Sequence, residues 1–206
     1  MERLRQAGLA RSVADAQLVA AVRGIVDAVR ARELDRRGLD RDHRWSRSCD
    51  LTATVRSAAV GEVEVALGLT GHQARTLITA ATARGSLYAT VAAALGRGEV
   101  TWDLVARFYD KTGPLEADQQ DLVATALLGT DPHLAAPDRL DPDGDLHGRA
   151  WPVAGYKAAL EAEVAACAGT DPGTERAARR RAYEARRVRV RVHDDGTAIM
   201  SVRGPA

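Results

Sequence analysis

The sequence predicts a mainly α-helical protein, a bundle of short helices that ends in a C-terminal β-hairpin. Apolar residues recur at intervals of three and four over most of the 206-residue chain, which is the period of an amphipathic helix. Near the C-terminus the pattern changes to strict alternation, with Val188, Val190 and Val192 between arginines. We therefore expect a helical domain over residues 1–186 and a hairpin over residues 187–203 that packs on it.

The individual helices follow from their capping residues and apolar faces. Ser12 is a favourable N-cap for the first helix. Thr70 followed by Gln73 has the spacing of a capping box and predicts the start of a helix. Gly85 offers a left-handed C-cap at the end of the same helix. The predicted helices cover about residues 12–37, 52–67, 70–85, 86–95, 101–112, 116–128, 153–166 and 174–186.

The segment between the sixth and seventh predicted helices, about residues 129–152, is rich in Pro, Gly and Asp and indicates a long loop. Its alternating Asp141, Asp143 and Asp145 are typical of a calcium loop. However, Leu146 stands where an EF-hand needs glycine, and Pro152 where it needs glutamate. We expect an Asp-rich turn without a metal. The turn of the hairpin is predicted at residues 195–196, whose Asp-Gly pair is typical of type I′.

The composition limits the functions that the chain could perform. Lys and Arg number 29 against 28 Asp and Glu, so any basic surface must be local. The two cysteines belong to no CxxC pair, and no apolar run approaches the roughly 18 residues of a membrane span or forms a signal peptide. We expect a cytoplasmic protein without a cofactor and without a small-molecule substrate.

Three longer stretches carry a family resemblance. They are "EVEVALGLTGHQARTLITAA" (62–81), "LYATVAAALGRGEVTWDLVARFYDKTGPL" (87–115) and "DPGTERAARRRAYEARRVRVRVHDDGTAIMSVRGPA" (171–206). In this order and at these intervals they resemble domain of unknown function 222, also called the 13E12 repeat family. The resemblance implies a domain that precedes an HNH endonuclease domain, with its Cys-rich and His-rich metal segment beyond the hairpin. The sequence contains no such segment, so the resemblance implies the partner of a nuclease and not the nuclease.

The first candidate site is the stretch "VEVALGLTGHQARTLI" (63–78), which resembles the corner of a helix-turn-helix. A recognition helix there would place His72, Gln73 and Arg75 against bases and phosphates. Against this interpretation, Glu64 stands where the two helices need a small residue, and Ala74 where a branched aliphatic residue is usual. A helical corner buried in a bundle is therefore the favoured alternative.

The second candidate is an arginine stripe in "ERAARRRAYEARRVRVR" (175–191), which holds eight arginines against two glutamates. Such cations would each neutralise about one phosphate, which gives a salt-dependent and sequence-independent contact. The alternative is a solvated face whose arginines pair with acids elsewhere. The stripe residues predicted to bind nucleic acid are Arg176, Arg179, Arg180, Arg187, Arg189 and Arg191.

These features predict a non-catalytic helical module that positions a nucleic acid weakly. No nucleophile, acid and base fall together in the sequence, so catalysis has no candidate constellation. The expected partners are DNA and an HNH nuclease domain, either its own or a separate one, and no membrane. The alternative is a protein-interaction or structural module in which the hairpin docks a partner chain or that nuclease domain.

Overall fold

The computed structural model describes residues 2–40, 48–168, 180, 181, 184, 187–192 and 198–203. Over these residues the chain is mainly helical, which confirms the predicted fold class at that level. The chain divides into two compact units, Met1–Gly113 and Pro114–Ala206. The prediction instead places residues 1–186 in a single helical domain. None of the described helices is long and apolar enough to cross a membrane.

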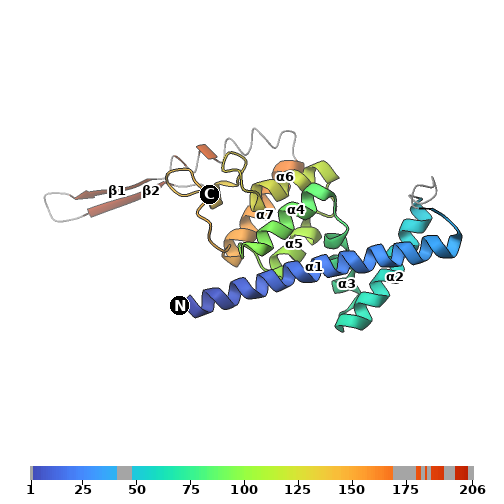
Figure 1. The fold of residues 1–206 in the computed structure, drawn as a ribbon. Helices are drawn as coiled ribbons and strands as arrows, with labels where there is room; N and C mark the ends of the chain where they lie inside the picture. The colour runs from blue at the N-terminus through green and yellow to red at the C-terminus, as the bar shows by residue number, and fades with distance from the viewer. Residues whose placement is uncertain are drawn as a thin grey trace. The chain divides into compact units, whose positions relative to one another are not determined.

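The first unit is a bundle of five helices within its described residues. They are α1 (Glu2–Arg37), α2 (Cys49–Leu67), α3 (Gly71–Ala81), α4 (Gly85–Gly96) and α5 (Trp102–Thr112). The long α1 packs against α2, α3 and α4, and α3 also packs against α2 and α5 (Figure 1). The buried α1 residues Val19, Val22, Val26 and Val29 follow the helical period and form its core face.

Helix α1 begins at Glu2, so the predicted start at Ser12 is wrong. Ser12 lies inside the helix and is buried. Residues 2–11 are all exposed, and no apolar face therefore marks them as helical. Their Glu, Arg, Leu, Gln and Ala residues have high helix propensity, which extends α1 by several turns, and Leu9 of this part lies against Gly98.

The boundaries of α2 and α3 show which capping signals hold. Ser48 caps α2 by accepting a hydrogen bond from Leu51 N, so the helix starts earlier than predicted. The capping box of Thr70 and Gln73 is confirmed. The predicted end of α3 at Gly85 is wrong, because the helix stops at Ala81 and Gly85 begins α4. The intervening turn needs no residue with a positive φ, so it gives glycine no advantage.

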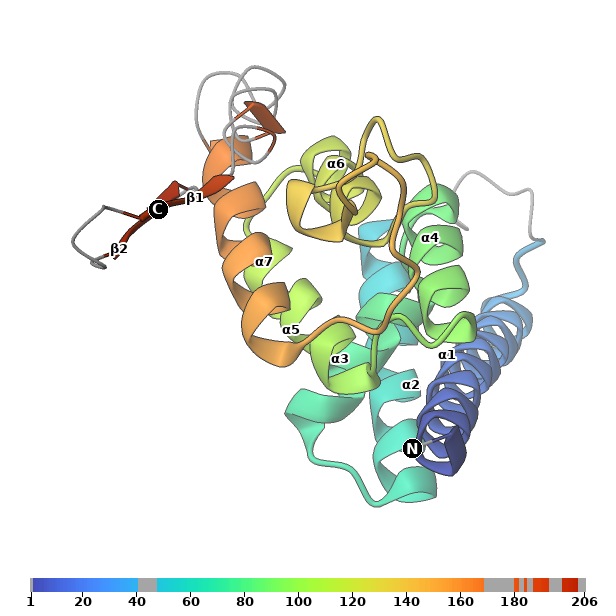
Figure 2. The same ribbon diagram turned by 90° about the vertical axis from the view of Figure 1, so that its left-hand side faces the viewer.

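The second unit contains α6 (Ala117–Leu128), the short helix η2 (Pro137–Arg139) and α7 (Val153–Ala168). Helices α6 and α7 pack on each other, and both contribute fully buried residues such as Leu127, Tyr156 and Leu160. Figure 2 shows the loop that leads from the end of α6 to the start of α7. Apart from η2, residues 129–152 lack helix and strand elements, which confirms the predicted loop.

This loop is held against the C-terminal end of α6, whose last carbonyls have no partner inside the helix. Ala136 N donates to Ala126 O at 2.8 Å, and the Trp151 indole Nε1 donates to Leu127 O at 3.0 Å. Arg139, which is buried, donates from Nη1 to Gly129 O at 2.6 Å. The loop therefore completes the hydrogen bonding that the helix cannot supply itself.

The Asp-rich motif forms a turn closed by its own backbone. The Asp141 carboxylate accepts hydrogen bonds from Asp143 N at 2.9 Å and Asp145 N at 3.0 Å. Gly144 has a φ of 90°, the left-handed region that suits glycine, and its N donates to Asp141 O. These bonds confirm the predicted Asp-rich turn.

Two strands, β1 (Arg187–Val192) and β2 (Ala198–Arg203), pair in antiparallel fashion. The register places Val188 opposite Val202, Val190 opposite Met200 and Val192 opposite Ala198. The turn predicted at residues 195–196 lies outside the described residues. So does the helix predicted over residues 174–186, except for residues 180, 181 and 184.

Candidate nucleic-acid interface

Helix α3, the predicted recognition helix, is largely a core helix. Six of its 11 residues are buried, and they face α1, α2 and α5. Thr76 is among them, and its hydroxyl donates to His72 O at 3.1 Å, so this side chain is not available to a base. Ala74 is fully buried, so the position that usually holds a branched aliphatic residue is already filled by a methyl group. The geometry favours the buried-corner interpretation.

The N-terminus of α3 already has an anion beside it. A methyl group added to Gly71 would lie 2.5 Å from Glu64 Oε1 and 3.3 Å from Arg75 Nη1. The carboxylate therefore lies at the positive end of the helix dipole, where negative charge is stabilising. A DNA phosphate approaching the same helix end would meet this carboxylate and be repelled.

The three predicted contact residues of α3 differ in what their side chains do. His72 is exposed, with Nε2 3.9 Å from Asp110 Oδ1. The side chain of Gln73 is part of the capping box, where its Oε1 accepts from Thr70 N at 3.0 Å. Arg75 is exposed, and among the described residues its guanidinium makes no hydrogen bond and no ion pair, although Glu64 Oε1 lies beside the same point on Gly71. Of the three, Arg75 is the best placed for a ligand.

A second arginine, Arg56 of α2, joins Arg75 at one depression of about 310 Å³, and sequence reasoning did not single it out. Ala53, Ser57 and Val60 line the rest of this depression, which we call the Arg56–Arg75 depression. The sequence signal that could have identified Arg56 was the helical period of α2. Residues 53, 56, 57 and 60 share the face of α2 opposite the buried Leu51, Val55, Ala59 and Val63.

Other arginines of the first unit have carboxylate partners. The pKa of Glu33 is lowered, mainly by its hydrogen bond from Arg36, and the pKa of Arg37 is raised, mainly by its hydrogen bond to Asp50. The pKa of Arg97 is raised by Glu99, whose carboxylate accepts from the guanidinium. The ion pairs are Arg11–Asp103, Arg32–Glu62, Arg36–Glu33, Arg37–Glu33, Arg37–Asp50 and Arg97–Glu99.

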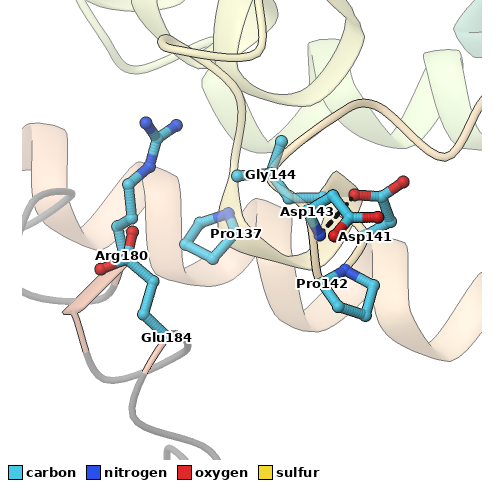
Figure 3. Close-up of a pocket in the computed structure, with 8 residues that line it drawn as sticks. Pro137, Asp141, Pro142, Asp143, Gly144, Arg180 and Glu184 are labelled. Atoms are coloured by element: carbon cyan, nitrogen blue, oxygen red, sulfur yellow. Dashed lines mark hydrogen bonds between the residues drawn. The ribbon is translucent and has the colours of Figure 1, made fainter.

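One member of the predicted arginine stripe, Arg180, has a structural role in the second unit. It is half-buried, and its Nη2 donates to Pro132 O at 2.6 Å and to Ala135 O at 3.4 Å. Figure 3 shows Arg180 and Glu184 on one side of a cavity of about 360 Å³, with Pro137 between them and the Asp141 turn. The guanidinium of Arg180 is thus tied to the long loop through Nη2. Only its other nitrogens could contact a phosphate.

The remaining stripe residues lie partly outside the described residues. Arg176 and Arg179 fall there. Arg187, Arg189 and Arg191 lie on β1, opposite Arg203, Ser201 and Ile199 respectively. These pairs alternate with the apolar pairs, and the two strands hold four arginines and no acid. In one apolar pair, Val190 is 62% exposed and Met200 67% exposed.

Comparison with known proteins gives no relative: no family model, no curated protein and no solved structure matches the chain. Within the described part of the chain, no group of three or more His, Cys, Asp or Glu residues is arranged to hold a metal ion.

Proposed function

We propose that this chain is a non-catalytic helical module that positions a nucleic acid through its phosphates, with β1 and β2 closing into a basic β-hairpin. The observation that carries the proposal is the strand register. Four arginines and no acid fall on the pairs Arg187–Arg203, Arg189–Ser201 and Arg191–Ile199. Residues two apart along a strand are separated by about 6.7 Å, so these cations recur at regular intervals.

A ribbon of this kind suits a nucleic acid for two reasons. A two-stranded ribbon fits the major groove of B-DNA, and like charges directly opposite each other in a ladder destabilise it unless an anion is present. Arg187 opposite Arg203 is such a pair. Because phosphate contacts carry no sequence information, the proposed binding is weak, salt-dependent and without base specificity.

The proposed biological context is a partner of an HNH nuclease domain. The order and spacing of the three stretches at residues 62–81, 87–115 and 171–206, which resemble the 13E12 repeat family, support it. In that context this module would hold the nucleic acid while the nuclease domain supplies the metal and the cleavage chemistry.

The test is binding of a fluorescent duplex to the full chain between about 50 and 200 mM salt. Changing Arg187, Arg189 and Arg191 together to Gln should reduce the steepness of log K against log salt by about 2.7, or about 0.9 for each lost phosphate contact. The matched control changes three exposed arginines elsewhere, Arg3, Arg5 and Arg149, to Gln. A wild-type slope near zero, or an equal loss in the control, would contradict the proposal.

A second candidate function is docking of another polypeptide, and the exposed pair Val190–Met200 favours it. Two large apolar side chains opposite each other make a small patch that a partner could cover. The double variant Val190→Thr, Met200→Thr separates the two functions. Docking of a second copy of the chain predicts that wild type self-associates with rising concentration in sedimentation and that this variant does not, whereas phosphate binding predicts an unchanged salt slope.

A further inference from the structure

The Arg56–Arg75 depression differs from its surroundings in charge. Arg56 of α2 and Arg75 of α3 line it, and no acidic residue does. Five other arginines of the same unit, Arg11, Arg32, Arg36, Arg37 and Arg97, form ion pairs with carboxylates. Glu64 does not line the depression, but its Oε1 and Arg75 Nη1 lie beside the same point on Gly71, where an added methyl group would meet them at 2.5 Å and 3.3 Å. The charged residues that line the depression are therefore all positive, on a nearly neutral protein.

One of the two cations is held in place from the neighbouring helix. Arg56 Nη2 donates to Thr79 Oγ1 at 2.5 Å, across from α2 to α3. The Thr79 hydroxyl in turn donates to Arg75 O at 2.9 Å, which orients its lone pairs toward the guanidinium. A side chain already fixed in this way loses less conformational entropy when it binds a ligand.

We propose that the Arg56–Arg75 depression is a binding site for a phosphate group. The two guanidinium groups would grip its oxygens, and the Ser57 hydroxyl would be a third donor. Each guanidinium presents up to five N–H donors in a planar fork that matches phosphate oxygens, and charge-assisted bonds of this type are the strong ones. Ala53 and Val60 add apolar walls that carry no competing acceptor.

The phosphate could come from a nucleic-acid backbone or from a small phosphorylated molecule, because both present the same oxygens. The site lies wholly within the first unit and uses none of the residues of β1 or β2. Its existence therefore does not depend on the proposed basic hairpin, and the two can fail separately.

The first arm of the test is an NMR titration of the arginine Nε–H resonances of the full chain with inorganic phosphate, at constant ionic strength set with chloride. We expect saturable shifts at Arg56 and Arg75. Arg75→Gln should weaken binding about tenfold, as expected for the loss of charge-assisted hydrogen bonds. Thr79→Val keeps both charges but removes the anchor of Arg56, and should weaken binding about threefold.

Arg5→Gln is the matched control, an exposed arginine on α1 whose removal should leave the phosphate affinity unchanged. Helical circular dichroism of every variant verifies folding, since both Arg56 and Arg75 are exposed. Shifts that do not saturate, or that Arg75→Gln and Arg5→Gln alter equally, would overturn the proposal.

The second arm replaces inorganic phosphate with a short DNA duplex. Saturable shifts at Arg56 and Arg75 with the duplex assign the phosphate to a nucleic-acid backbone. Shifts with inorganic phosphate but not with the duplex assign it to a small phosphorylated molecule. If the triple variant of β1 binds duplex as wild type does while Arg56 and Arg75 still shift, the hairpin proposal fails and this site stands.

Discussion

The long loop at residues 129–152 and the α2–α3 corner both contain sequence typical of a ligand site, yet they use their polar groups differently. In the loop, the Asp141 carboxylate and the Arg139 guanidinium bind the protein's own backbone. In the corner, Thr70 and Gln73 cap a helix, while Arg75 has no partner among the described residues. A motif thus indicates where polar atoms are, and the hydrogen bonds show which of them remain available.

The difference has a physical cause. An irregular segment packed on a helix end must satisfy its backbone groups with whatever donors and acceptors it carries, because buried unpaired groups are costly. A helical corner satisfies most backbone groups internally, so its surface side chains are free of that requirement. Changes to side chains that bind backbone groups, in the loop or at the cap of α3, should therefore affect stability, whereas changes to Arg75 on the corner surface should affect binding.

The largest expected effect is that of Gly129→Ala. The new methyl group would lie 2.5 Å from Thr125 O, a backbone atom that cannot move aside. We expect a loss of about 3 kcal/mol in the free energy of unfolding, measured by urea denaturation followed by circular dichroism. Gly61→Ala is the control, since nothing lies within 4 Å of its added methyl group, and it should stabilise α2 by up to about 1 kcal/mol. Equal stability of the two variants would refute the account of Gly129.

The next effect is that of Trp151→Phe, which removes the indole donor to Leu127 O. A buried carbonyl at the end of α6 would lose its partner, at a cost of about 2 kcal/mol in the free energy of unfolding. Trp102→Phe is the matched control, because its half-buried indole has no hydrogen bond among the described residues. If both variants lose the same stability, the loop does not hold α6 through this bond.

A smaller effect is expected at the corner from Thr70→Ala, which removes the N-cap of α3. The loss should be about 1 kcal/mol in the free energy of unfolding. Thr70→Ser, which keeps a capping hydroxyl, should retain most of the wild-type stability. Phosphate affinity at Arg56 and Arg75 should stay unchanged, since Thr70 does not line the depression. A change in affinity without a change in stability would be the opposite of this expectation.

The smallest effect concerns a paired arginine cluster on α1. The pKa of Glu33 is lowered, so its contribution to stability is present above the unfolded-state pKa and is lost as the pH falls through the folded-state value. Wild type and Glu33→Gln should therefore differ slightly in melting temperature at neutral pH and converge in acid. A gap that stays constant in acid would show that the ion pairs with Arg36 and Arg37 do not contribute.

Local signals in the sequence predicted much of the fold. The capping box at Thr70 and the Asp-rich turn at Asp141 involve residues a few positions apart, so their spacing was sufficient. The start of α1 was missed because residues 2–11 have no buried face. The pairing of Arg56 with Thr79 joins residues 23 positions apart on two helices. Such a contact depends on how α2 packs against α3, which no local pattern contains.

The bond from Arg56 to Thr79 makes the depression sensitive to the helices beneath it. Arg56 belongs to α2, but its guanidinium is hydrogen-bonded to Thr79 of α3. A rotation of either helix would therefore change the separation of Arg56 and Arg75. A core change such as Leu77→Ala, at a buried position that does not line the depression, should therefore alter phosphate affinity. The phosphate affinity of the surface site would then report on how the helices pack inside the bundle.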